Sequence, residues 1–153
     1  MQYDAIPEEL KRLDQWVCWG VDKIKPKMPF DPKTMQAAKA GVPDTWGSYE
    51  QAVQRVQSGE AGGVGFEFNN NGYYGVDLDK VIDELGGLTP EAQDVVTTLT
   101  GYTELSPSGT ELHIIVKANG VKLDTNRKGF LEIYCEGRYF TMTGNIYEGV
   151  SCQ

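Results

Sequence analysis

Asp77 and Asp79 are separated by one residue in the segment YYGVDLD, where they alternate with Val76 and Leu78. In a β-strand, residues i and i+2 share a face, so the two carboxylates would point the same way, about 6–7 Å apart. Two such charges repel by about 2–3 kcal/mol at an effective dielectric constant near 20. A bound divalent cation would remove this repulsion, whereas a solvated strand face is the alternative explanation of the pair.

A histidine follows a serine-rich turn in ELSPSGTELHIIVKA. The alternation predicts a strand in which His113 and Ile115 face one side and the intervening aliphatic residues face the other. Ser106 and Ser108 lie in the kind of turn whose hydroxyls and backbone N–H groups can hold an anion. His113 would add a donor for phosphate there, or it is a core residue with an ordinary hydrogen-bond partner.

A third carboxylate and an arginine occur in GFLEIYCEGRYFTMTGN, which predicts two strands joined at a hairpin turn. A two-residue loop would pair Arg138 with Cys135, on the face opposite to Glu132. A three-residue loop with Gly137 in the left-handed conformation would pair Arg138 with Tyr134, on the same face as Glu132. Both registers are compatible with the sequence.

The elements that must position these residues form a mixture of helices and strands. Helix starts are expected at Pro7, at Ser48 with Gln51 as a capping box, and at Thr89 followed by Pro90. Strand patterns occur in WVCW, GGVGFEF, YYGVDLD, YTELS, ELHIIVKA, GFLEIYC and RYFTMTG. The second and third of these should be joined by the NNNG turn. The pattern predicts an α/β or α+β fold with a sheet of mixed direction.

Length and composition indicate one globular domain: 153 residues, 40% hydrophobic and 24% charged. The net charge of −8 argues against a protein that coats nucleic acid. Basic residues form an early and a late group: Lys23, Lys25, Lys27 and Lys33, then Arg127, Lys128 and Arg138.

Targeting and cysteine signals point to the cytoplasm. No apolar run approaches the ~20 residues of a membrane span, and the N-terminus lacks a signal-peptide pattern. Cys18, Cys135 and Cys152 are scattered, which suits reduced thiols. With a single histidine and no C-x-x-C, we expect no structural zinc site.

Taken in order, GVDLD, SPSGTELHIIV and LEIYCEGRYFTMTGN resemble motifs I, II and III of the archaeo-eukaryotic primase superfamily. The similarity is greatest to the primase–polymerase domains of phage and plasmid replication proteins. WVCW, KPKMPFDP and DTWGSYEQA also resemble the opening segment of that group, so the resemblance covers nearly the whole chain.

The resemblance implies roles for individual residues. Asp77, Asp79 and Glu132 fall on the metal-binding acidic positions, which would hold two Mg²⁺ or Mn²⁺ ions and carry the catalysis. His113 falls on the position that contacts the phosphates of the incoming nucleotide, and it is expected to take part in catalysis as well. The remaining nucleotide-binding positions match Ser106, Ser108, Arg138 and Asn145.

The implied fold is an α+β catalytic core. An RRM-like mixed sheet, over about residues 61–153, would join a smaller N-terminal α/β unit, over about residues 1–60, with the active site in the cleft between them. The chain stops soon after TGN, whereas such proteins commonly continue into a helical domain and often a helicase. We therefore expect a fragment or minimal form of such a protein.

The implied activity is DNA-directed nucleotidyl transfer onto a primer 3′-hydroxyl, in the replication of a phage or mobile element inside the bacterial cytoplasm. Expected partners are dNTPs or NTPs, a single-stranded template with its primer, and a helicase; no membrane is expected. Two alternatives remain. A glycosyltransferase would use D-x-D with manganese but would not predict SPSGTELH, and a non-catalytic nucleotide- or DNA-binding module would keep the fold without extending primers.

Overall fold

The computed structural model describes residues 2–82, 85, 87–99, 101–117, 127–128 and 130–147. It contains two β-sheets and few helices, so the expected α+β class is confirmed. Cys152 and the C-terminal end of the expected 61–153 unit lie outside the described residues.

Within the described part of the chain, eight strands form the two sheets. The three-stranded sheet has the order β1 (Trp16–Trp19), β2 (Gly63–Asn69) and β8 (Glu136–Met142). The five-stranded sheet has the order β4 (Tyr102–Leu105), β5 (Leu112–Lys117), β3 (Tyr73–Leu78), β7 (Leu131–Tyr134) and β6 (Arg127–Lys128). The expectation of mixed direction was wrong, because every pairing between described strands is antiparallel.

The helices are short. They are α1 (Glu8–Lys11), α2 (Tyr49–Gln57) and α3 (Pro90–Thr98), with 3₁₀ turns η1 (Tyr3–Ala5) and η2 (Pro43–Thr45). The predicted capping box is present at α2, where Ser48 and Gln51 bond reciprocally, and Thr89 caps α3. Among the described residues, no helix has the length and apolarity needed to cross a bilayer.

Neither expected hairpin forms. At each of the two turns the chain instead crosses from one sheet to the other. β2 and β3 are consecutive in the chain but lie in different sheets, and so do β7 and β8. The Asn70 N–H donates to the Cys135 carbonyl at 2.7 Å, which shows that the two crossings lie beside each other. A short turn between two strand patterns fits a corner between packed sheets as well as a hairpin, so local sequence did not distinguish them.

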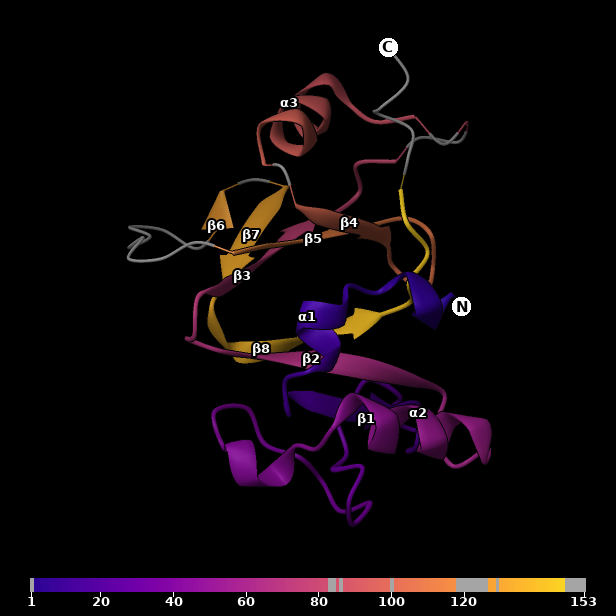
Figure 1. The fold of residues 1–153 in the computed structure, drawn as a ribbon. Helices are drawn as coiled ribbons and strands as arrows, with labels where there is room; N and C mark the ends of the chain where they lie inside the picture. The colour runs from indigo at the N-terminus through magenta and orange to yellow at the C-terminus, as the bar shows by residue number, and fades with distance from the viewer. Residues whose placement is uncertain are drawn as a thin grey trace.

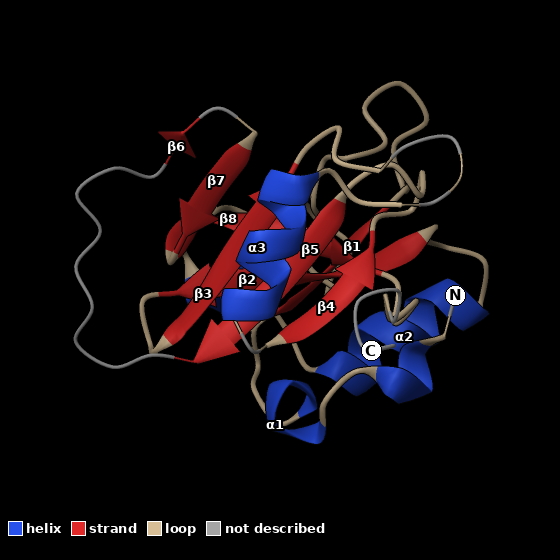
Figure 2. Cartoon of the chain, turned by 90° about the horizontal axis from the view of Figure 1, so that it is seen from above, coloured by secondary structure: helices blue, strands red, loops and turns tan. Residues whose placement is uncertain are grey.

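The elements stack in layers, with α3 over one face of the five-stranded sheet and the three-stranded sheet along its other face (Figure 1). Figure 2 shows α3 lying across the strands of the five-stranded sheet. Val76, Leu78, Leu112 and Ile114 form the core beneath α3. The opposite face of the same strands meets the three-stranded sheet, where an apolar cluster includes Phe66, Phe68, Ile115 and Phe140.

The TGN segment is held against β4 by a buried carboxylate. Glu104 is fully buried and accepts hydrogen bonds from the Thr143 and Gly144 N–H groups at 2.8 Å and from the Tyr102 hydroxyl at 2.7 Å. The Leu105 N–H donates to the Asn145 carbonyl at 2.8 Å. These bonds fix the C-terminal end of β8 relative to the five-stranded sheet.

Candidate active site

A row of charged and polar residues crosses the five-stranded sheet on one face. In the observed register, Asp77 on β3 lies opposite His113 on β5 and opposite Glu132 on β7. Residues directly opposite each other in antiparallel strands share a face, so three separate segments bring these side chains together. Their face is the one that turns toward the three-stranded sheet, opposite to the core beneath α3.

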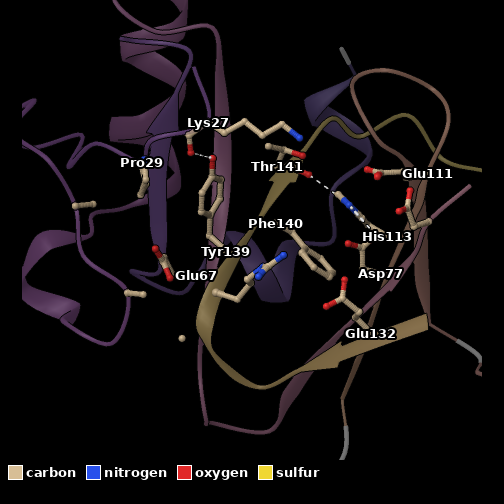
Figure 3. Close-up of a pocket in the computed structure, with 15 residues that line it drawn as sticks. Lys27, Pro29, Glu67, Asp77, Glu111, His113, Glu132, Tyr139, Phe140 and Thr141 are labelled. Atoms are coloured by element: carbon tan, nitrogen blue, oxygen red, sulfur yellow. Dashed lines mark hydrogen bonds and ion pairs between the residues drawn. The ribbon is translucent and has the colours of Figure 1, made fainter. Parts of the chain in front are cut away.

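The row borders a cavity of about 670 Å³, which is also lined by residues of the three-stranded sheet and of the loop after β1 (Figure 3). Its lining residues are Lys27, Pro29, Ala38, Ala40, Glu67, Asp77, Asp79, Glu111, His113, Glu132, Gly137, Arg138, Tyr139, Phe140 and Thr141. A cavity with this many ionisable groups from separate segments is the leading candidate for the functional site.

Five carboxylates line the cavity, and four of them lie on or beside the five-stranded sheet: Asp77, Asp79, Glu111 and Glu132. Burial raises the pKa of Asp77 to about 6, with Glu132 and Asp79 adding repulsion. Burial also raises the pKa of Glu111 to about 7, with further contributions from its hydrogen bond to Asp79 and from the charge of Asp77. The Asp77 Oδ1 atom is buried and has no hydrogen-bond partner among the described residues. Such an arrangement favours a cation over protons at neutral pH.

His113, which lies opposite Asp77 in the row, is buried. Its ring stacks on Phe140 with centroids 4.4 Å apart, and its Nδ1 lies 3.4 Å from the Thr141 carbonyl. A carbonyl only accepts, so Nδ1 carries the proton, and Nε2 faces Asp77 Oδ1 at 3.6 Å. Burial lowers the pKa of His113 to about 4, so the imidazole is neutral at pH 7 in the ligand-free protein.

Two cationic side chains from separate segments line the cavity. Arg138 follows Gly137, whose φ is +72°, and its guanidinium lies 4.5 Å from the centroid of the Tyr134 ring. Arg138 therefore lies on the Glu132 side, although β7 and β8 form no hairpin. Lys27 extends from the loop after β1 toward Thr141 (Figure 3), and its charge lowers the pKa of both Asp77 and Glu111.

Comparison with known proteins agrees with this chemistry. A protein named DNA primase-polymerase, from Nitratiruptor phage NrS-1, is 32% identical over 156 residues, which cover 97% of this chain and 21% of the phage protein. This chain is related to a phage DNA primase-polymerase. The predicted relationship is thereby confirmed, and the chain spans about one fifth of that relative's length. No family model matches the chain.

The structure gathers most, but not all, of the predicted site residues. Asp77, Asp79, His113, Glu132 and Arg138 line the cavity. Asp79 lies just after β3, where its N–H donates to the Phe130 carbonyl at 3.0 Å. The side chains of Arg127 and Lys128, predicted to add to the late basic group, lie outside the described residues.

Ser106, Ser108 and Asn145 do not line this cavity. The Ser106 hydroxyl accepts a hydrogen bond from the Glu111 N–H at 3.2 Å and lies 3.2 Å from the Ser108 hydroxyl. The serines thus shape the turn that leads to Glu111. The assignment of these three residues to nucleotide binding stays a prediction.

Glu111 and Lys27 were missed as site residues. Ligand atoms of Asp77, Glu111 and His113 lie within 4.8 Å of one another, a different set from the predicted Asp77, Asp79 and Glu132. The sequence contained a signal for Glu111, because Glu111 and His113 are two residues apart in a strand pattern and so share a face. No local signal identified Lys27 among its neighbouring lysines, since only the folded loop brings it to the cavity.

Proposed function

We propose that this chain is the catalytic core, over residues 1–153, of a metal-dependent DNA primase or polymerase. In this role it adds nucleotides to a primer 3′-hydroxyl during replication of a phage or mobile element. The observation that carries the proposal is the cavity in which the carboxylates of Asp77, Asp79, Glu111 and Glu132 lie together with a histidine, an arginine and a lysine. The relationship to a phage DNA primase-polymerase supports it.

The donor set suits Mg²⁺ or Mn²⁺, which prefer hard oxygen ligands. Two ions held by Asp77, Asp79 and Glu132, with Glu111 as a further oxygen donor, would offset the burial and the charge repulsion that raise the pKa of Asp77 and Glu111. When bound, such ions activate the attacking hydroxyl and stabilise the leaving pyrophosphate. Asp77 Oδ1 is buried and has no hydrogen-bond partner among the described residues, so it is the atom whose desolvation a cation would offset most directly.

The residues of the chain have separate roles in this proposal. Arg138 and Lys27 provide charge for the phosphates of the incoming dNTP or NTP, and an arginine fork binds phosphate oxygens in two places. His113 donates a hydrogen bond to a phosphate through Nε2, which must carry a proton when the nucleotide is bound; the negative phosphate favours that proton. Ser106, Ser108 and Asn145 are proposed to support the triphosphate from the neighbouring turns.

The proposed partners extend beyond the nucleotide. A single-stranded template and its primer end would approach the open side of the cavity, and a helicase domain or protein would separate the strands. We place this activity in the cytoplasm of a bacterial host.

A primer-extension assay with Mg²⁺ and Mn²⁺ compared tests the proposal. Asp79→Asn and Glu132→Gln should each abolish extension while leaving the melting temperature within a few degrees of the unsubstituted protein. Asp94→Asn is the matched control, because Asp94 is exposed on α3, across the five-stranded sheet from the cavity. Metal-dependent nucleotide binding without extension would instead indicate a non-catalytic binding module.

A further inference from the structure

Glu67 is a buried carboxylate that the proposed catalysis does not use. It lies on β2, is only 1% exposed, and its Oε1 has no hydrogen-bond partner among the described residues. Its backbone is fixed on both sides, because its N–H donates to the Gln15 carbonyl and its own carbonyl accepts from Gln15 Nε2, each at 2.7 Å. Buried polar atoms are nearly always paired, so an unpaired carboxylate oxygen held this rigidly points to a ligand.

Glu67 lines the same cavity as Asp77 but from the opposite wall (Figure 3). It pairs with Tyr139 on β8, and the next residue on that face of β8 is Thr141, whose carbonyl contacts His113. Glu67 and the proposed phosphate position at His113 therefore border one cavity. The neighbouring Tyr139 hydroxyl donates to the Lys27 carbonyl at 2.5 Å, so it does not satisfy Glu67.

A carboxylate oxygen in this position requires a hydrogen-bond donor from the ligand. The nucleobases differ in the donors they present, and thymine has no amino group. The sugar 3′-hydroxyl is the donor common to all four deoxynucleotides. An enzyme that copies any template therefore has more use for a fixed acceptor at the sugar than for one at the base.

We propose that Glu67 accepts a hydrogen bond from the 3′-hydroxyl of the incoming nucleotide and so positions its sugar. This inference rests on the proposed function. Glu67 acts here as a positioning residue: with the sugar held from β2 and the phosphates from β3, β5 and β8, the α-phosphate has one orientation toward the primer. Burial raises the pKa of Glu67 to about 7, and both of its protonation states can accept from a hydroxyl.

The test compares nucleotides that differ only at the 3′ position. Binding of dATP and ddATP, and of dTTP and ddTTP, is measured by calorimetry with Mg²⁺ and without primer. At pH 8, where Glu67 is mostly ionised because its pKa is about 7, the unsubstituted protein should prefer each deoxynucleotide over its dideoxy analogue by about tenfold, since hydrogen bonds to charged groups are among the stronger ones. Glu67→Leu should lower the affinity for the deoxynucleotides to that for the dideoxy analogues, which should themselves bind unchanged.

Two further variants complete the experiment. Glu67→Gln keeps a weaker carbonyl acceptor and should reduce the preference severalfold, which carries the test if the leucine variant fails to fold. Glu50→Gln, exposed on α2, should change neither affinity. A preference retained in full by the Glu67 variants, or an effect seen with adenine but not thymine, would overturn the inference alone. Absence of any metal-dependent nucleotide binding by the unsubstituted protein would overturn the proposed function as well.

Discussion

Asp77 carries opposing demands at the scale of a single residue. Its backbone lies near the C-terminal end of β3, the central strand of the five-stranded sheet, and pairs with strands on both sides. Its side chain lies among other carboxylates. Burial and the neighbouring charges of Glu132 and Asp79 raise its pKa to about 6. A strand position that would be more stable with a neutral residue is thus occupied by an acid, which is expected where function requires it.

Asp77→Asn should separate stability from activity. A raised pKa means that the folded state holds its proton more tightly than the unfolded state, so the free energy of unfolding falls as pH rises from about 4 to about 6 and stays lowered above it. Without metal at pH 8, the variant should therefore be as stable as the unsubstituted protein or more stable, by about 1–2 kcal/mol, and it should not extend primers.

Urea unfolding with and without Mg²⁺ measures this prediction. Added Mg²⁺ should stabilise the unsubstituted protein and have little effect on Asp77→Asn, since ligand binding to the folded state alone raises stability. A variant that unfolds, or one that still extends primers, would show that Asp77 is not a metal ligand.

His113 can be tested with two amides that imitate different ring atoms. Asparagine places its amide near Nδ1 and can keep the Thr141 contact, whereas glutamine reaches the Nε2 position that faces Asp77. If Nε2 contacts phosphate, His113→Asn should weaken nucleotide binding by about 1–3 kcal/mol and His113→Gln by less.

A purely structural histidine gives a different order. In that case His113→Asn would retain more stability than His113→Gln, and nucleotide affinity of the folded fraction would be equal in both. Calorimetric binding and thermal melting on the same preparations distinguish the two results.

At the scale of elements, the sequence correctly predicted those features that depend only on neighbouring residues. The capping box at Ser48 and the cap at Thr89 depend on neighbouring residues, and both are present. The alternation around His113 placed it opposite to the α3-facing residues because a strand's side-chain period is fixed. The two hairpin predictions were wrong, because the pairing of a strand depends on which sheet buries its apolar face. That choice depends on residues far apart in the chain, as the approach of Asn70 to Cys135 shows.

The TGN segment illustrates a constraint that only the folded element reveals. Gly144 has φ +72°, and an added Cβ would lie 1.9 Å from the Gln2 carbonyl oxygen. Gly144→Ala should therefore cost more than the about 1–2 kcal/mol of a left-handed residue, because the N-terminal segment must also move. We expect a loss of about 3–4 kcal/mol in the free energy of unfolding.

Gly59→Ala is the matched control for this substitution. Gly59 has φ +85°, but nothing lies within 4 Å of its added Cβ, so only the backbone cost of about 1 kcal/mol applies. Equal losses in the two variants, measured by urea unfolding, would show that the contact with Gln2 is not restrictive.

At the scale of the whole molecule, the candidate site depends on both sheets and on a loop near the N-terminus. The row of Asp77, His113 and Glu132 could be predicted because each of these three residues lies in a recognisable strand pattern. The opposite wall could not, since Lys27 and Glu67 reach the cavity only through the packing of β1, β2 and β8. Their sequence surroundings resemble an ordinary surface loop and an ordinary buried strand.

The charge of the whole chain makes a prediction about nucleic acid. With a net charge of −8, the protein repels the phosphate backbone at long range, and the cations in its cavity are few. Binding of a primer–template by this chain should therefore be weak and release few counterions. The slope of log K against log salt should be well short of that for 6–10 phosphate contacts. Extension should be distributive and unprimed initiation poor, because the chain itself holds the primer–template weakly.

Nucleotide binding should be independent of this weak DNA binding, since all of the proposed nucleotide ligands lie between Lys27 and Asn145. Titrating salt in a fluorescence anisotropy assay with labelled primer–template, alongside calorimetry with dNTP and Mg²⁺, measures the two properties on one preparation.

Lys27→Ala should weaken dNTP binding, because the charge of Lys27 reaches the carboxylate cavity. Lys27→Ala should leave the shallow salt slope for DNA binding nearly unchanged. Lys23 is a neighbouring exposed lysine outside the cavity lining, so Lys23→Ala should change neither dNTP affinity nor the salt slope. Tight and steeply salt-dependent DNA binding by residues 1–153 would contradict this separation of nucleotide binding from template grip.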